Sequence, residues 1–198
     1  MLQGSAGERN LVLCKEGVLH MRSHAGKAQK KTDYFLSPDR TFITAKDSMG
    51  HIYYLDAEDE HFLHERCFFR NKGNGYFEGK AFGKLERLHR LVMGAKPGEY
   101  LDHISRDKRD NRKSNLRFCT NSQNQANAVA SVRSSTGYKG VFQNNPTAKW
   151  RNPQKPYKSS IRVRGVSHHL GYFYTIKKAK EAYDKASSFY FGEFANSL

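Results

Sequence analysis

The stretch LDHISRDKRDNRKSNLRFCTNSQNQAN, residues 101–127, decides the fold of this chain. It holds one His, three Asp and five Asn but few apolar residues, so it is either a solvated loop or a tight fold around a metal ion and a phosphate. The runs 100–104 and 116–119 are typical of short strands, and the polar residues 107–114 join them. Thr120 or Asn121 can then cap a helix.

This helix is expected from about Ser122 to Ala130, with Ala126, Val129 and Ala130 on its inner side. Strand, loop, strand and helix form one β–loop–β–α unit of about thirty residues, which is too small to bury a core alone. We therefore expect the preceding segment or a metal ion to hold the unit together.

The net charge of +15 is unevenly distributed. Residues 1–69 carry 9 Lys/Arg and 10 Asp/Glu, residues 70–133 carry 14 and 6, and residues 134–198 carry 11 and 3. The excess lies in the last two thirds of the chain, as is typical of a polyanion-binding surface. A generally basic protein with solvated faces is the alternative. Membrane-surface binding is disfavoured because no basic amphipathic helix with a broad Leu/Phe face is visible.

The cysteines and the hydropathy point to a reducing, aqueous compartment. Cys14, Cys67 and Cys119 are far apart and odd in number, so they form neither a disulfide framework nor a CxxC zinc site. No apolar run reaches the roughly 18–20 residues of a membrane span, and no secretory apolar region is visible near residue 1. We expect a soluble, cytoplasmic protein that does not bind membranes.

The flanking segments predict an α+β fold. We expect weak order over residues 1–33 and a β-rich scaffold over 34–93, in which 56–69 form a short helix and 76–92 form strand pieces. After a short polar linker, a second set of strands followed by a helix is expected. The later elements are three strands and a helix capped by Thr175, over residues 138–142, 159–163, 168–173 and about 175–190. The apolar face of that helix consists of Ile176, Ala179, Tyr183, Ala186 and Tyr190.

Four polar residues of the opening stretch could form one site. Asp102 and His103 are adjacent on a strand, so both border one cavity only if the strand bends or ends there. Asp102 and Asn124 would supply two oxygen ligands, which suit Mg²⁺ or Mn²⁺ better than zinc. His103 could take a proton from water. Asn115 could bridge backbone groups and hold the loop shut, although each of these residues alone is more often structural.

Three segments carry a family resemblance: LHRLVMG (88–94), YLDHISRDKRDNRKSNLRFCT (100–120) and QNQAN (123–127). They resemble the HNH (His-Me finger) nucleases, in the branch found in phage and intron-encoded homing endonucleases. The family pattern is an Asp-His pair, an Asn-Leu-Arg and a third position on the following helix. Here the spacings are 12 from His103 to Asn115 and 9 from Asn115 to Asn124, with Asn124 where the family name has His.

The resemblance implies a ββα-metal core over residues 94–132 that hydrolyses a DNA phosphodiester with one Mg²⁺ or Mn²⁺ per active site. His103 would be the general base, Asp102 and Asn124 the metal ligands, and Asn115 the brace of the loop. The candidate phosphate contacts are Arg106, Arg112 and Arg117, for which a solvated surface role is equally open. We expect a site-specific endonuclease of the homing type, phage-encoded and monomeric, that nicks one strand of double-stranded DNA and has no small-molecule substrate.

The C-terminal part carries a second resemblance, in TGYKGVFQNN (136–145), KWR (149–151), IRVRG (161–165) and the segment from His168 to Ala195. These resemble the plant ethylene-response-factor (ERF, APETALA-type) DNA-binding domain. The resemblance implies, over residues 133–198, a three-stranded antiparallel sheet in the major groove with one helix packed behind it. The candidate DNA contacts are Lys139, Trp150, Arg151, Arg162 and Arg164. Arg162 and Arg164 are expected to alternate onto one face of a strand.

Other functions stay open at this point. The HNH unit could be purely structural in a sequence-specific DNA-binding regulator. A zinc-stabilised domain is disfavoured because the cysteines do not occur in closely spaced pairs in the sequence. Charge alone also permits an RNA target. The scaffold segment could add secondary DNA contacts from Lys80, Lys84 and Arg87.

Overall fold

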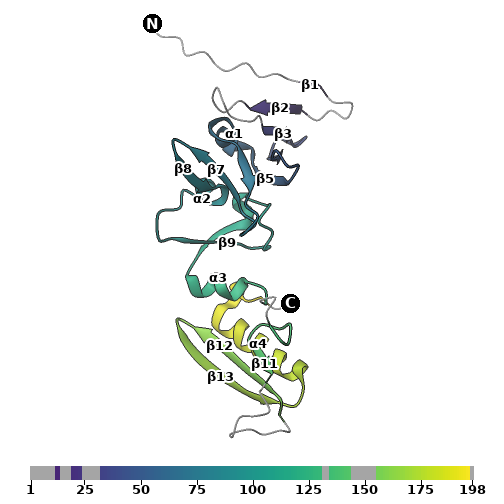
Figure 1. Ribbon diagram of the computed structural model, residues 1–198, viewed down its shortest axis with the longest axis vertical. Helices are drawn as coiled ribbons and strands as arrows, with labels where there is room; N and C mark the ends of the chain where they lie inside the picture. The colour runs from purple at the N-terminus through teal and green to yellow at the C-terminus, as the bar shows by residue number, and fades with distance from the viewer. Residues whose placement is uncertain (1–11, 14–18, 24–31, 131–133, 144–154, 197–198) are drawn as a thin grey trace. The chain divides into compact units, whose positions relative to one another are not determined.

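A computed structural model describes residues 12–13, 19–23, 32–130, 134–143 and 155–196 (Figure 1). The described chain divides into two compact units, Met1–Arg117 and Phe118–Leu198. The predicted nuclease segment 94–132 is therefore shared between the units rather than forming one of its own. Trp150, Arg151 and most of the segment 1–33 lie outside the described residues.

The first unit consists mainly of short antiparallel strands. One sheet has the order β1–β2–β3–β4–β5, a second has the order β6–β7–β8, and β9 pairs with β10. The strands are β1 (Val12–Leu13), β2 (Leu19–Ser23), β3 (Thr32–Leu36), β4 (Phe42–Lys46), β5 (Ile52–Asp56), β6 (Phe68–Arg70), β7 (Phe77–Ala81), β8 (Lys84–Arg87), β9 (Tyr100–His103) and β10 (Leu116–Cys119). The helices are α1 (His61–Glu65) and α2 (Leu88–Val92), with 3-10 turns η1 (Ala57–Asp59) and η2 (Lys113–Asn115).

The core of this unit forms where alternate residues of β4 and β5 face inward. Ile43, Ala45, Tyr53 and Leu55 are fully buried, which is the period-two pattern of a sheet with one buried face. The ring of Tyr53 lies 4.5 Å from that of Phe77, so the second sheet packs on the first through aromatic side chains. The prediction of a β-rich scaffold is confirmed.

Two local predictions on this unit are wrong. Residues 76–92 end in a helix rather than a strand, because Leu88 and Val92 are buried four residues apart on one side of α2. The helix expected over 56–69 is limited to η1 and α1. At Arg66 the backbone becomes extended (φ −155°, ψ 151°), and Phe68–Arg70 pairs with β7 as a strand.

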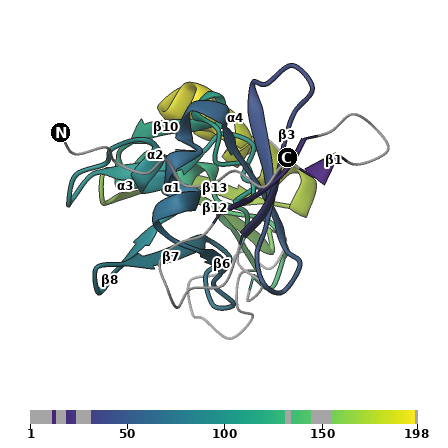
Figure 2. The same cartoon turned by 90° about the horizontal axis from the view of Figure 1, so that it is seen from above.

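The second unit is a three-stranded antiparallel sheet with one long helix packed against it, as expected (Figures 1 and 2). Its core contains Ala126, Ile161, Tyr183 and Phe191. The elements are α3 (Asn121–Asn127), β11 (Val141–Gln143), β12 (Tyr157–Val163), β13 (Val166–Phe173), α4 (Ile176–Phe191) and the 3-10 turn η3 (Gly192–Phe194).

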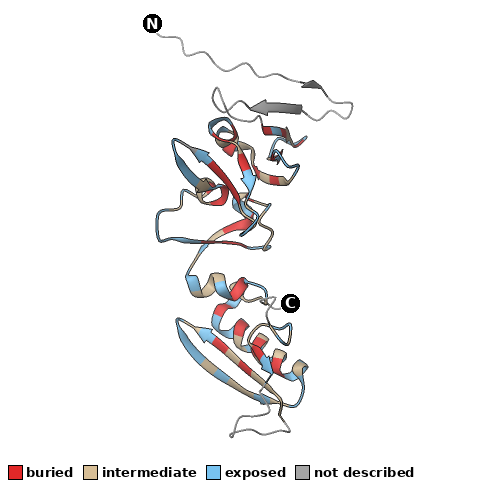
Figure 3. Ribbon diagram, in the orientation of Figure 1, coloured by how far each residue is buried: buried red, intermediate tan, exposed pale blue. Residues whose placement is uncertain are grey.

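Helix α4 begins as predicted, since the Thr175 hydroxyl accepts a hydrogen bond from the Lys178 N–H at 3.3 Å. Its inner face is as predicted at Ala179 and Tyr183, but in the last two turns the buried positions are one residue later than expected. The buried residues recur every fourth position (Figure 3): Ala179, Tyr183, Ser187 and Phe191. Tyr190 is partly exposed, but its ring stacks on that of His168 in β13, with 5.4 Å between the centroids.

Close packing between β11 and α4 depends on a glycine. Gly140 has φ +67°, and a Cβ built there would lie 2.1 Å from the ring of Tyr183 and 2.6 Å from the Ser160 carbonyl oxygen. Only glycine permits this approach, because the backbone oxygen cannot move aside without breaking the strand pairing. Ser160 N–H donates to the Gly140 carbonyl at 2.9 Å.

Candidate active site

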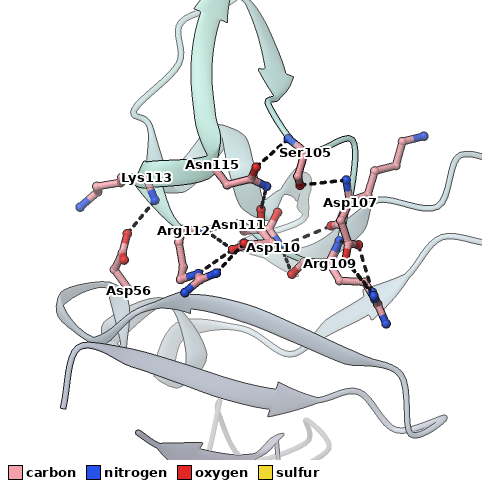
Figure 4. Close-up of polar contacts among 10 residues, drawn as sticks. Asp56, Ser105, Asp107, Arg109, Asp110, Asn111, Arg112, Lys113 and Asn115 are labelled. Atoms are coloured by element: carbon pink, nitrogen blue, oxygen red, sulfur yellow. Dashed lines mark hydrogen bonds and ion pairs between the residues drawn. The ribbon is translucent and has the colours of Figure 1, made fainter. Parts of the chain in front are cut away.

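The candidate site is built around the loop between β9 and η2. This loop lies along the edge strand β5: Tyr54 N–H donates to the Arg109 carbonyl at 2.8 Å, and Asn111 N–H donates to the Tyr54 carbonyl at 2.9 Å. The carboxylate of Asp56 accepts from the Lys113 N–H at 2.7 Å (Figure 4). The scaffold therefore holds the polar loop as an added edge segment, and the edge of β5 is covered by chain rather than left open.

Asn115 closes the loop from inside. Its amide oxygen accepts from the Ser105 N–H at 2.9 Å, and its NH₂ group donates to the Asp110 carbonyl at 2.8 Å (Figure 4). The side chain is buried, and its own carbonyl accepts from the Ile104 N–H at 2.8 Å. The expected bridge between backbone groups is present, and its role in catalysis stays a prediction.

A second asparagine sets the orientation of His103. The NH₂ group of Asn111 donates to the carbonyls of Lys108 and Arg109, at 3.4 and 3.0 Å. Its amide oxygen therefore faces the His103 ring, 3.4 Å from Nε2. An amide oxygen only accepts, so Nε2 carries the proton and Nδ1 carries the lone pair. This is the tautomer needed for a proton acceptor at Nδ1.

His103 is packed in a cluster of rings. Its centroid lies 5.1 Å from that of His89 and 5.9 Å from that of Tyr76, and Tyr76 lies 4.8 Å from His89. Burial lowers the pKa of His103 from its ordinary value. Burial, with nearby cationic groups, lowers the pKa of His89 to about 3. Both rings are therefore neutral at pH 7, and a neutral His103 can accept a proton.

Asp102 is buried beside a cation. Its Oδ2 accepts from Nε and Nη2 of Arg117, at 3.2 and 3.0 Å. Leu101, Asp102 and His103 are all buried, because β9 ends at His103 and the chain turns into the loop. Arg117 was expected to contact phosphate. In this structure it neutralises Asp102, and its side chain is only 13% exposed.

The remaining predicted ligand lies in the other unit. Asp102, His103 and Asn115 are together in the first unit, whereas Asn124 is carried by α3 in the second. Helix α3 starts with a capping box: Thr120 Oγ1 accepts from the Gln123 N–H at 3.2 Å, and the Gln123 side chain accepts from the Thr120 N–H at 2.7 Å. It ends at Asn127 rather than Ala130, and Val129 is 67% exposed, so the predicted inner face stops at Ala126.

The donor chemistry suits a hard metal ion. Among the described residues, no group of three or more His, Cys, Asp or Glu side chains could hold a metal. Mg²⁺ needs no such group, because it keeps several waters and takes one or two protein oxygens together with substrate phosphate. The carboxylate of Asp102 and the amide oxygen of Asn124 are donors of this kind, so these residues fit Mg²⁺ or Mn²⁺ by type.

The predicted phosphate-binding arginines differ in their surroundings. Arg112 is held by Asp110 through two contacts, at 2.8 and 2.7 Å. Arg106 has φ +66° and lies at a cavity beside the loop. Arg106 therefore lines the cavity, while Arg112 orders the loop.

The residues of the second unit that were predicted to contact DNA also differ in their surroundings. The Nζ of Lys139 donates to the carbonyls of Ala126 and Ala128, at 2.7 and 2.9 Å, and to that of Gln125. Lys139 thus closes the C-terminal end of α3. Arg162 is exposed on β12, but Arg164 is not on the strand. Arg164 and Gly165 form a two-residue turn with φ +48° and +85°, so the two arginines do not alternate along one strand as expected.

Sequence reasoning missed Asn111 and left His89 without a role. Asn111 is one of several asparagines in a polar run, and nothing in the sequence marks it as buried. His89 had a signal, because it lies in the segment LHRLVMG that carries part of the family resemblance. Tyr76 gave none, since its contact with His103 joins residues distant in sequence.

Comparison with known proteins places these residues in a family segment. Residues 86–126, which include Asp102, His103, Asn115 and Asn124, match the family model described as HNH endonuclease. An uncharacterized HNH endonuclease of Acanthamoeba polyphaga mimivirus is 31% identical over 128 residues, which is 62% of this chain and 62% of the relative. No solved structure matches the chain.

The chain therefore contains an HNH endonuclease domain, and this domain is what points to a nuclease with a nucleic-acid substrate. The chain spans less than two thirds of the length of the viral relative. None of the described helices is both long and apolar enough to cross a membrane.

Proposed function

We propose that this protein is a metal-dependent DNA endonuclease in which His103 accepts the proton of the attacking water. One observation carries the proposal: Asn111 fixes the tautomer of a buried, neutral His103 at the end of β9, inside the HNH segment. A general base needs this combination of an oriented ring and an unprotonated nitrogen. General-base catalysis of this kind contributes about 10²- to 10⁴-fold to the rate.

The other residues of the proposed site act on His103 or on the phosphate. Asn115 and Asn111 hold the loop so that the imidazole cannot rotate. Arg117 compensates the charge of Asp102 until substrate binds. Asp102 and Asn124 would hold one Mg²⁺ or Mn²⁺, which when bound would polarise the scissile phosphate and favour departure of the 3′ oxygen.

The second unit fits the role of DNA reader. Its three-stranded sheet backed by α4 has the architecture that the ERF-type resemblance implies, and Arg162 and Arg164 are exposed on it. We propose that it binds double-stranded DNA through this sheet, and that the whole chain is a site-specific, homing-type enzyme. A single HNH site per chain favours a nick in one strand by a monomer.

The test is nicking of supercoiled plasmid with Mg²⁺ by His103→Ala and Asp102→Asn. Both variants should lose at least about 10²-fold in rate while DNA affinity is kept. The Asn replacement keeps the size of Asp102 beside Arg117, so a folded protein is expected. Rapid nicking by His103→Ala would rule out the assigned base.

Two observations favour the alternative of a DNA-binding regulator. Asp102 is engaged by Arg117 and His103 is only 4% exposed, which also suits a purely structural core. If the protein is such a regulator, the wild type binds DNA but does not nick it with Mg²⁺ or Mn²⁺, even when the plasmid contains its preferred binding sequence.

A further inference from the structure

A cavity of about 820 Å³ opens on the first unit, beside the loop that carries the candidate site. Three chain segments line it: the turn between β4 and β5, the turn between β6 and β7, and the loop after His103. The lining residues are 50–52, Arg70, 72–75 and 106–109. Ile52 is the only aliphatic residue among them, so the cavity is unsuited to an apolar ligand.

The lining is strongly cationic. Five of its residues are basic, namely Arg70, Lys72, Arg106, Lys108 and Arg109, against one carboxylate, Asp107. That carboxylate is already used, since Arg109 binds it through Nη2 at 2.8 Å and through Nε. Within the described part of the chain, Arg70 and Lys72 make no ion pair, and both are exposed. The cavity thus has cationic groups available for an anionic partner.

The walls of the cavity are fixed before any ligand binds. In the β6–β7 turn, the Asn71 amide oxygen accepts from the Gly73 N–H at 2.9 Å. Lys108 joins this turn to the loop, because its Nζ donates to the Asn74 carbonyl at 2.8 Å. Asp47 joins the same turn to β4 and β5 by accepting from the Arg70 N–H at 3.0 Å. Such preorganisation lowers the entropy cost of binding.

Two residues that line the cavity, Lys108 and Arg106, connect it to the surroundings of His103. Lys108 Nζ lies 4.3 Å from the centroid of the Tyr76 ring, and that ring lies 5.9 Å from His103. On the other side, the Arg106 N–H donates to the His103 carbonyl at 2.9 Å. A chain molecule that places one phosphate at His103 would therefore place neighbouring phosphates in the cavity.

We propose that this cavity binds the sugar-phosphate backbone of substrate DNA next to the phosphate that is cut. The proposal rests on the proposed function and deepens it, because it makes the β6–β7 turn part of the substrate site. Arg70 and Lys72 supply the charge, and Gly73 and Gly75 let the backbone approach closely. Two of the three scaffold cations first considered are less suited to this role, since Lys84 pairs with Glu86 and Arg87 pairs with Glu78.

The experiment measures DNA affinity separately from cleavage. The full-length protein binds a fluorescent duplex oligonucleotide in EDTA, with anisotropy read over a range of salt concentrations. Arg70→Gln and Lys72→Gln should each lower affinity by about 5- to 10-fold at 0.1 M salt and reduce the salt slope by about one. Lys72→Arg, which keeps the charge, should bind like the wild type.

Arg40→Gln is the matched control. Arg40 is an exposed cation of the same unit in the turn between β3 and β4. That turn lies at the opposite end of β4 from the turn that lines the cavity, about 17 Å away for a five-residue strand. The control should keep both the affinity and the salt slope. Equal losses in Arg40→Gln and Lys72→Gln would overturn the proposal by showing only a general charge effect.

The outcomes separate this proposal from the proposed function. Normal affinity of both cavity variants, with nicking lost in His103→Ala, would refute the DNA-binding cavity and leave the endonuclease intact. Lost affinity in the cavity variants, with nicking kept in His103→Ala, would support the cavity and refute the assigned base. A duplex RNA that binds more tightly than DNA and is more affected by Lys72→Gln would overturn the assignment to DNA.

Discussion

Replacing Asn115 by Ala tests whether the loop holds the candidate site in place. The change removes two hydrogen bonds, from the Ser105 N–H and to the Asp110 carbonyl. Ser105 is exposed, so water can replace the first at a cost of about 0.5–1.5 kcal/mol. The Asp110 carbonyl is partly buried, and leaving it unpaired costs about 1–3 kcal/mol. The unfolding free energy of the first unit should fall by about 2–4 kcal/mol.

Asn115→Asp is the control that separates the two bonds. A carboxylate can still accept from the Ser105 N–H but cannot donate to the Asp110 carbonyl. Thermal denaturation followed by circular dichroism should show the Ala variant melting about 5–15 °C below the wild type. Nicking should be measured well below that temperature, where the loop is loosened but the unit is folded.

If the loop positions His103, Asn115→Ala should lower both the melting temperature and the rate of nicking. Nicking at low temperature should fall by more than about tenfold in Asn115→Ala, and DNA affinity should fall less, since Arg70 and Lys72 lie outside the loop that Asn115 closes. Melting within about 1 °C of wild type would refute the energetic argument. Normal nicking by a destabilised variant would refute the positioning role of the loop.

Two further predictions concern charged groups. Burial alone would raise the pKa of Asp47, but hydrogen bonds from the backbone of Arg70, from the His51 ring and from nearby N–H groups hold this pKa below its usual range. Ionised Asp47 therefore stabilises the folded protein above the unfolded pKa of about 3.9. This stabilisation is lost as the pH falls through the lower pKa of the folded state. In urea denaturation, Asp47→Asn should be less stable than the wild type by about 1.5–3 kcal/mol at pH 7. This difference in unfolding free energy should shrink towards pH 3, and a difference that stays constant would contradict the prediction. Lys139→Met should lower the unfolding free energy of the second unit by about 1–3 kcal/mol, while DNA affinity stays near that of the wild type. Lost DNA affinity with an unchanged melting temperature would instead favour the DNA contact expected from the sequence.

Elements whose signals are local were predicted well from the sequence. The start of α4 was predicted from Thr175, and of the two caps considered for α3, Thr120 and Asn121, the structure has Thr120. Strand β10 was predicted over the residues that form it. In each case one residue type satisfies backbone groups a few positions away, so no distant contact is needed.

Elements that depend on distant contacts were predicted less well. Helix α2 was taken for a strand because Leu88–Val92 is short and apolar, and periodicity cannot separate helix from strand in such a run. The packing of Tyr76 and His89 on His103 joins three segments of the chain. Asn111 is buried only because Tyr54 holds its backbone at the edge of β5. Such pairings are set by tertiary packing, which no local pattern encodes.

The placement of α3 shows why the predicted nuclease core could not be delimited from sequence. Only one apolar residue of this seven-residue helix is buried, Ala126, so α3 cannot stabilise itself and must take its support from a neighbour. From the sequence we expected this support to come from the preceding segment or a metal ion. The structure shows support from the following one: Lys139 binds the last carbonyls of α3, and Arg164 N–H donates to Ser122 Oγ at 3.2 Å. The helix that carries Asn124 is thus built into the proposed DNA reader. If Asn124 is a metal ligand, the unit proposed to read DNA also supplies one of the two metal ligands, while Asp102 belongs to the first unit.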